Sequence, residues 1–253
     1  MASSSPSWGL AMLKELDDLN KLEKEVNQAL QSASEGSLIP PKPISLASLP
    51  LPQSPLNEKA TAYAKSWLNS DVFLHSMRSY YFGTAIATAN FAHWNWDPQV
   101  FYLASVLHDL GLSSVAMEQT PLSFEFHGGL LARDFLLREG APARVSDSVA
   151  EAIIRHTDNI WETFGHSPEN ALLIFGTHLD VYGAFNPLIH ADTVQEVVNG
   201  FPRNNFCNVF ADLFLQEVKI KRFCKAVERV QDSGFISKVR NNAVFAKYDH
   251  QSL

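Results

Sequence analysis

The feature that most restricts the fold of this chain is an apolar segment that ends in two polar residues. Residues 101–107 read Phe-Tyr-Leu-Ala-Ser-Val-Leu, which predicts a helix buried on nearly every side, and His108 and Asp109 follow immediately. Burying an imidazole beside a carboxylate is costly unless each is paired or holds a metal ion. We therefore expect a polar site inside a helical core, with a core histidine beside a capping aspartate as the alternative.

Helical patterns continue through the chain after about Leu56, without sustained alternation of polar and apolar residues. Asp97-Pro98 and Ser167-Pro168 predict helix starts, because Asp and Ser cap helices and proline suits the first helical position. The prediction is an all-α helical bundle with helices at about residues 57–69, 71–92, 98–109, 128–139, 144–157, 168–184 and 204–231.

The first 55 residues follow a different pattern. Between Trp8 and Ser34, leucine and valine recur mostly at three- and four-residue intervals, which predicts an amphipathic accessory helix. Six prolines follow within residues 36–55, and this density is incompatible with a continuing helix. We expect a proline-rich strap, and we divide the chain into residues 1–55, which form the helix and strap, and one domain of residues 56–253.

Composition and charge narrow the function classes. The chain has 253 residues, 46% of them hydrophobic, which is enough for one large core. A formal net charge of -7 argues against a nucleic-acid partner. Two cysteines and the lack of a run of roughly 18 apolar residues argue against a disulfide framework and a membrane segment. We expect a cytoplasmic or nuclear protein that binds a small-molecule substrate and forms a homo-oligomer.

Two residues on other predicted helices complete a candidate metal site. His75 lies in the helix at 71–92, and Asp180 shares one face of the helix at 168–184 with Gly176, which is small enough to let another helix approach closely. Together with His108 and Asp109, they offer two imidazoles and two carboxylates, a set that suits zinc, iron, manganese or nickel. We expect one divalent cation, Zn²⁺ first and Fe²⁺ or Mn²⁺ as alternatives, whose bound water has its pKa lowered toward about 7.

The order of these four residues resembles the HD superfamily of metal-dependent hydrolases, which is named for its adjacent His and Asp. Within residues 63–207 the chain also resembles the fungal cyanamide hydratases, in the segments His75-Ser76-Met77-Arg78, Leu107-His108-Asp109-Leu110-Gly111, Ser123-Phe124-Glu125-Phe126 with Gly128-Gly129, Ala152-Ile153-Ile154-Arg155-His156 and Phe201-Pro202-Arg203. The resemblance implies an HD-domain bundle with the activity of a hydro-lyase. Such an enzyme adds water to cyanamide, or to a related small nitrile or isonitrile, through a metal-bound hydroxide to give urea or an amide.

Several residues are candidates for roles beside the metal. As hypotheses, Asp109 accepts the proton of the metal-bound water, and His156 or Thr157 supplies either a donor to the nitrogen on which negative charge develops or a proton relay. His156 falls on the inward face of its helix, and a core histidine bonded to a backbone carbonyl is the alternative. The predicted substrate pocket comprises Arg78, Phe124, Glu125, Phe126 and His127, in part on a turn at residues 123–129 that could equally serve only as a helix start.

Two positions depart from the family pattern. His127 stands where an aromatic residue is expected, and Val181-Tyr182 precede Gly183 where relatives tend to have an asparagine, so the pocket is expected to be remodelled. His178 lies two residues before Asp180 on the same helix and is expected to point away from it, which argues against direct ligation.

Three other functions are compatible with the same residues. The metal set could hydrolyse a nucleotide or another phosphate ester, although the acidic balance and the lack of a glycine-rich phosphate loop argue against it. A di-iron oxygenase would need a second metal, for which His127 and His156 could serve. A non-enzymatic interaction protein would use its N-terminal helix, but the four intact ligands argue for catalysis.

Overall fold

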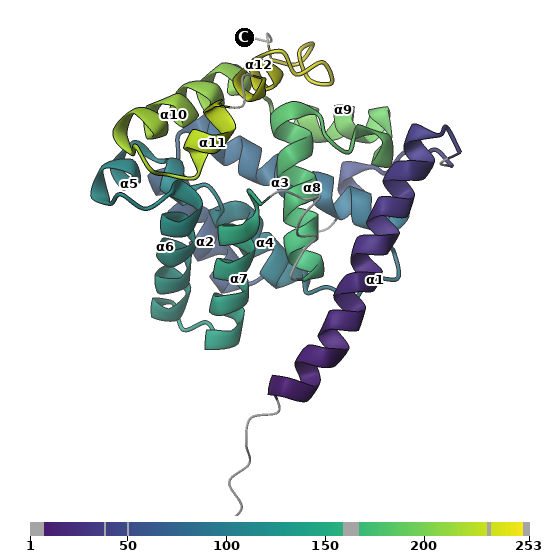
Figure 1. Ribbon diagram of the computed structural model, residues 1–253, viewed down its shortest axis with the longest axis horizontal. Coiled ribbons are helices and arrows are strands. Elements are labelled where there is room, and N and C mark those ends of the chain that lie inside the picture. Colours follow the sequence, from purple (N-terminus) through teal and green to yellow (C-terminus); the bar gives the residue numbers. More distant parts are fainter. Residues whose placement is uncertain (1–7, 38, 50, 159–166, 232–233, 250–253) are drawn as a thin grey trace, which may run out of the picture.

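The chain folds into a bundle of helices, which the computed structural model describes for residues 8–37, 39–49, 51–158, 167–231 and 234–249 (Figure 1). None of these residues forms a strand, so the all-α prediction is confirmed. The described elements are α1 Trp8–Ser34, η1 Leu46–Ser48, α2 Pro55–Trp67, α3 Ser70–Asn90, α4 Pro98–Leu107, η2 Leu110–Leu112, α5 Ser114–Gln119, α6 Phe124–Arg138, α7 Ala143–Arg155, α8 Pro168–Tyr182, η3 Asn186–Leu188, α9 Ala191–Gly200, α10 Phe206–Ile220, α11 Ala226–Gln231 and α12 Phe235–Arg240.

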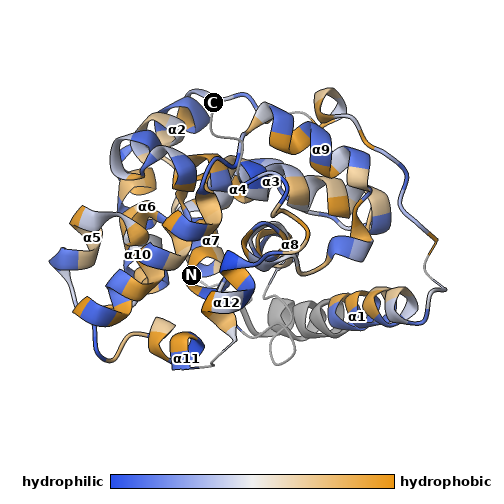
Figure 2. Ribbon diagram, turned by 90° about the horizontal axis from the view of Figure 1, so that it is seen from above, coloured by the Kyte–Doolittle hydropathy of each residue, from blue (hydrophilic) through white to orange (hydrophobic). Residues whose placement is uncertain are grey.

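The centre of the bundle is formed by α3, α4 and α8, whose residues are buried over most of their length. Seen from above, α8 stands in the middle of the molecule with the other helices around it (Figure 2). The predicted close approach at Gly176 is confirmed, because a β-carbon there would overlap the backbone carbonyl of Ser79 on α3. The tight crossing of α3 and α8 brings His75 and Asp180 from distant parts of the chain into contact.

The predicted starts of α4 and α8 are also confirmed. The Asp97 side chain accepts hydrogen bonds from two backbone amides at the start of α4, and Ser167 accepts one from Asn170 at the start of α8. Proline occupies the first turn of each helix, where the missing N–H costs nothing. The helix that leads into His108 and Asp109 and the helix that carries Asp180 therefore both have local sequence signals for their first residue.

The predicted helix at 204–231 is wrong as a single element, because α10 ends at Ile220 and α11 begins at Ala226. Lys221 is buried, and its Nζ donates to the carbonyl oxygen of Leu122 at 2.7 Å. The backbone N–H of Lys225 donates to Ser123 Oγ at 2.7 Å. These contacts with a segment about 100 residues earlier hold the chain in a turn that local sequence does not reveal.

Other boundaries also differ from the prediction. Helix α6 begins at Phe124 rather than at 128, so the expected turn at 123–129 is mostly the first part of a helix. The short helices α5 and α12 and the ten-residue helix α9 were not predicted. In α9, three of the residues that face the core are valines, which weakens a helical signal because valine also favours strands.

The accessory helix and the strap both contact the main body. In α1, Leu22 and Val26 are buried, and Glu25 accepts a 2.8 Å hydrogen bond from the indole N–H of Trp94. The strap is fixed by backbone N–H groups that donate to two side chains of α9, from Ile44 to Thr193 and from Leu46 to Glu196. The other end of α1 extends beyond the body (Figure 1). Among the described helices, none has both the length and the apolar character of a membrane span.

Candidate metal centre

Three of the four predicted ligands converge at the end of α4. His75 comes from the first half of α3, His108 and Asp109 follow α4 directly, and all three are about 1% exposed. The Nε2 atoms of the two histidines are 3.3 Å apart, and Asp109 Oδ2 lies 3.2 Å from His108 Nε2 and 3.7 Å from His75 Nε2. These three side chains form a group in which one ligand atom from each lies within 4.8 Å of the others.

The other nitrogen of each imidazole is held by an acceptor. His75 Nδ1 lies 2.7 Å from Asp180 Oδ2, and His108 Nδ1 lies 2.8 Å from the backbone oxygen of Ser105. A carboxylate and a carbonyl can only accept, so each Nδ1 carries the proton and each Nε2 keeps a lone pair in the neutral ring. The two lone pairs therefore face one another in a buried site, an arrangement that a cation or a shared proton stabilises.

Asp109 supplies the anionic atom of this group. Its Oδ2 is buried and has no hydrogen-bond partner among the described residues. Burial raises the pKa of Asp109, but His108 outweighs this and brings the pKa below its usual value. In the same way, burial lowers the pKa of His108, but the Asp109 carboxylate raises it overall. Two imidazole lone pairs and one unpartnered carboxylate oxygen are a donor set that fits a divalent transition metal.

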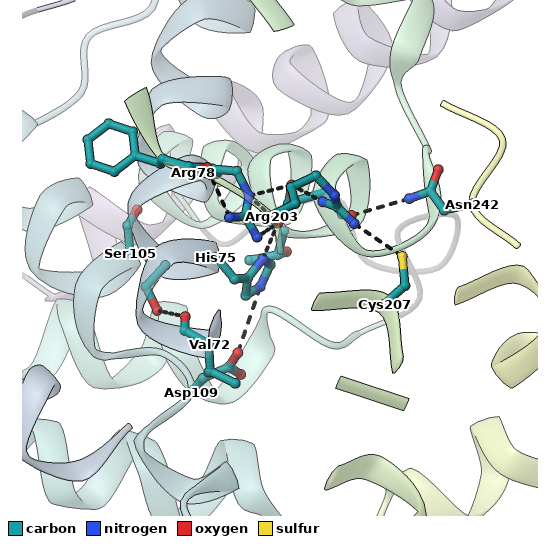
Figure 3. Close-up of polar contacts among 12 residues, drawn as sticks. Val72, His75, Arg78, Ser105, Asp109, Arg203, Cys207 and Asn242 are labelled. Atoms are coloured by element: carbon teal, nitrogen blue, oxygen red, sulfur yellow. Dashed lines mark hydrogen bonds and ion pairs between the residues drawn. The ribbon is translucent and has the colours of Figure 1, made fainter. Parts of the chain in front are cut away.

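The His75 ring lies between Asp109 and the two arginines Arg78 and Arg203 (Figure 3). Asp180 contacts Nδ1 of His75 on the arginine side. Arg78 Nε donates to its two carboxylate oxygens at 2.9 and 3.0 Å, and Arg203 Nη1 donates to Oδ1. Burial raises the pKa of Asp180, but Arg203 and Arg78 lower it far below its usual value. Asp180 is thus linked to the converging group by its hydrogen bond with the His75 ring.

The two arginines extend this polar cluster to the end of the chain. Arg203 is fully buried, and its Nε and Nη2 donate to the carboxylate of Asp249. The same guanidinium lies 5.0 Å from the centre of the Phe206 ring and 4.4 Å from that of Phe245. With Arg78 and Asp180 the cluster holds two positive and two negative charges, so burial leaves no net charge uncompensated.

A small cavity opens beside the three converging side chains. Its volume is about 30 Å³, and a cavity needs about 10–15 Å³ to hold one water molecule. There is thus room for a molecule of a few non-hydrogen atoms. The lining residues lie on or directly after α3, α4, α6, α7, α8, α10, α11 and α12. They are His75, His108, Asp109, Phe124, His156, Thr157, Thr177, His178, Val181, Tyr182, Phe210, Phe214, Arg229 and Phe235.

The lining includes three predicted residues besides the metal group. His156 follows α7, its Nδ1 lies 2.6 Å from the carbonyl oxygen of Ile153, and its ring meets that of His108 edge to face at 4.9 Å. Burial and the nearby His108 lower the pKa of His156 to about 3. Thr157 Oγ1 donates to Glu125 Oε1 at 3.2 Å. Phe124 closes the cavity on the α6 side, where its backbone N–H donates to Glu217 at 2.7 Å.

The other predicted pocket residues lie outside this lining. Arg78 is bound to Asp180, and Glu125 is buried behind Thr157. Phe126 is 43% exposed, and His127 is at the surface, where its Nε2 lies 3.3 Å from a Gln119 oxygen. Phe126 and His127 lie outside the lining because residues 124–127 are helical, so successive side chains point in different directions around α6.

The opposite wall of the cavity carries residues to which the sequence assigned no role. Phe210 and Phe214 are one turn apart on α10, a spacing that could have identified this apolar face. Arg229 and Phe235 come from α11 and α12. His178 is outside the metal group, as expected, but it lines the cavity together with Tyr182. Burial lowers the pKa of His178 well below its usual value and raises that of Tyr182 to about 12.

Comparison with known proteins identifies the family to which this chain belongs. No protein-family model matches the chain. Two curated relatives from Saccharomyces cerevisiae, cyanamide hydratase DDI2 and cyanamide hydratase DDI3, are each 34% identical to it over 166 residues. The matched region covers 65% of this chain and 73% of each relative. At this identity and coverage, the chain belongs to the cyanamide hydratase family.

Proposed function

We propose that this protein is an enzyme that adds water to cyanamide and releases urea, with a divalent cation held by His75, His108 and Asp109. The observation that carries the proposal is the convergence of two imidazole lone pairs and an unpartnered carboxylate oxygen at the wall of a cavity of about 30 Å³. The names of the two yeast relatives provide the substrate.

The donor set suits zinc, with Fe²⁺ or Mn²⁺ as alternatives. A divalent cation bound there would act as a Lewis acid and lower the pKa of water toward about 7. Asp180, which the sequence suggests as a fourth ligand, orients His75 in this arrangement by accepting from Nδ1. Direct ligation by Asp180 is the competing assignment, and substitution of Asp180 separates the two.

Cyanamide suits the cavity because it is linear and has three non-hydrogen atoms. Hydration forms one C–O bond and breaks one C–N π bond, and the released electron pair takes a proton on nitrogen. A second proton then moves from oxygen to nitrogen to give urea. The chain must therefore accept a proton from water and supply one to nitrogen, in a place where bulk water does not compete.

The cavity residues can divide these tasks. Asp109 is placed to accept the proton of water, because its carboxylate borders the cavity beside the two histidines. His156 adjoins His108, and its Nε2 carries a lone pair, since Nδ1–H donates to a backbone carbonyl. We assign to His156 a proton relay, in which Nε2 takes up the proton released by water and returns it to the nitrogen that becomes negative, with Thr157 beside it. Phe124, Phe210 and Phe214 exclude water from the other walls.

Other reactions receive less support. Pockets for drug-sized ligands have volumes of roughly 300–1,000 Å³, so a nucleotide would need a much larger opening than this cavity. A second iron site at His127 and His156 is disfavoured, because His127 lies at the surface and His156 lines the cavity.

A single preparation can test the proposal by elemental analysis and by urea release from cyanamide. We expect about one metal ion per chain and urea production in the wild type, and loss of both in His108→Ala. The matched control is His93→Ala, because the His93 side chain is 59% exposed on another part of the surface. Urea release by metal-free protein, or hydrolysis of nucleoside monophosphates without any urea from cyanamide, would contradict the proposal.

A further inference from the structure

The polar side chains of the cavity wall differ in whether the protein provides them with partners. Thr157 donates to a buried glutamate, and Thr177 donates to a backbone carbonyl of its own helix. Arg229 contacts the backbone carbonyl of Thr157 and the hydroxyl group of Tyr182. These four groups are satisfied within the fold, so none of them needs a ligand.

His178 is the exception on this wall. It lies on α8, is only 6% exposed and lines the cavity, yet its Nδ1 is buried and has no hydrogen-bond partner in the part of the chain that the structure describes. The ring is hydrogen-bonded to the backbone of His156. Because Nδ1 makes no bond, we assign that bond to an Nε2 proton, which leaves Nδ1 as an acceptor with a lone pair.

His178 is connected to the metal centre through His156. It adjoins His156, and the ring of His156 is in edge contact with that of His108. A short linear molecule with its reacting carbon beside His108 and Asp109 would direct its other end toward the remaining wall. A buried acceptor without a partner is unfavourable, and a ligand N–H group in reach would satisfy it.

We propose that His178 determines specificity by accepting a hydrogen bond from the amino group of the substrate. The preferred substrate class is then small nitriles that carry N–H donors next to the nitrile carbon, rather than alkyl nitriles of the same size. This inference rests on the proposed hydration activity and deepens it. It follows the rule that a site built to bond a polar group discriminates strongly against an analogue without that group.

The test compares cyanamide with acetonitrile, which has the same shape but a methyl group in place of the amino group. We would measure kcat and KM for urea release from cyanamide and the inhibition constant of acetonitrile, in the wild type, His178→Leu, His178→Met and His178→Asn. The two apolar variants should raise KM for cyanamide roughly tenfold or more, since a buried hydrogen bond is lost. Acetonitrile inhibition should be unchanged or stronger.

His178→Asn is the matched control, because its amide oxygen can take the place of Nδ1, and it should keep KM within about threefold of the wild type. All variants should retain the metal, measured by elemental analysis. An unchanged ratio of KM to the acetonitrile inhibition constant in a metal-loaded apolar variant would overturn the inference while leaving the proposed function intact. Absence of urea release from the metal-loaded wild type would overturn both.

Discussion

Charged and polar side chains lie on both sides of the His75 ring, but only on one side does each of them have a partner within the described part of the protein. On the Nδ1 side, Asp180 and Asp249 are matched by Arg78 and Arg203, and the charges balance. On the Nε2 side, His108 presents a second lone pair at 3.3 Å, and one oxygen of Asp109 has no hydrogen-bond partner among the described residues. Both sides are equally buried, so burial alone does not identify a functional site. The side that the fold leaves incomplete is the one that borders the cavity.

The largest effect is expected from removing the charge on the incomplete side. Asp109→Asn should abolish metal binding and lower urea release by roughly a thousandfold or more, because the site loses its anionic ligand and its proton acceptor. Thermal stability without metal should stay the same or rise, since a buried carboxylate with an unpartnered oxygen is removed. Elemental analysis and thermal unfolding measure both effects, and Asp147→Asn at an exposed ion pair is the control.

His156→Ala should separate chemistry from metal binding on the same side. We expect kcat to fall by roughly a hundredfold or more, because the proton relay from water to the developing charge is lost. Metal content should remain near one ion per chain, since His156 is outside the converging group. Loss of the metal would show that His156 is a ligand.

Asp180→Asn tests the complete side. Leaving Arg78 without a carboxylate partner, and Arg203 with Asp249 alone, should lower the free energy of unfolding by about 3–5 kcal/mol. Metal affinity should fall by roughly 10–100-fold, the usual cost of losing a residue that orients a ligand. Competition with a chelator measures the affinity of the folded protein. Complete loss of metal from a variant that remains folded would instead assign Asp180 as a direct ligand.

The two sides should also respond differently to acid. The pKa of His108 is raised above its usual value of 6.5 by Asp109, so a proton competes with the metal for Nε2 as the pH falls through that raised pKa. Below it, metal affinity should fall by roughly tenfold per pH unit. The pKa of Asp180 is lowered, so its contribution to stability is present above its unfolded pKa and is lost only as the pH falls through the folded value.

Metal release can be measured by dialysis and helicity by circular dichroism, both over the same pH range. The metal should leave between about pH 7 and 5 while the helical signal is retained. Coincident loss of metal and helicity would contradict the distinction between the two sides.

Local sequence signals predicted much of the fold and all three converging residues. An apolar helix that ends in His108-Asp109 identifies a polar site in the core, and the face shared by Gly176 and Asp180 predicts the contact with α3. The balance between the two sides of His75 could not be predicted. It depends on Arg203 and Asp249, which reach Asp180 through the packing of segments with no local signal for that contact.

The far wall of the cavity was unpredictable for a similar reason. Whether His178 faces the cavity or a neighbouring helix depends on where α11 and α12 lie, and their positions follow from the turn after α10. The predicted pocket residues Phe126 and His127 lie outside because the expected turn is a helix. Sequence periodicity predicts which residues share a helix face but does not reveal what that face meets.

A crystal structure of the metal-loaded protein, with anomalous diffraction measured at the absorption edge of the bound metal, tests the central claim most directly. We predict one anomalous peak bonded to Nε2 of His75, to Nε2 of His108 and to a carboxylate oxygen of Asp109, beside the cavity. A peak on the arginine side of His75, or a metal bound by residues other than these three, would contradict the account.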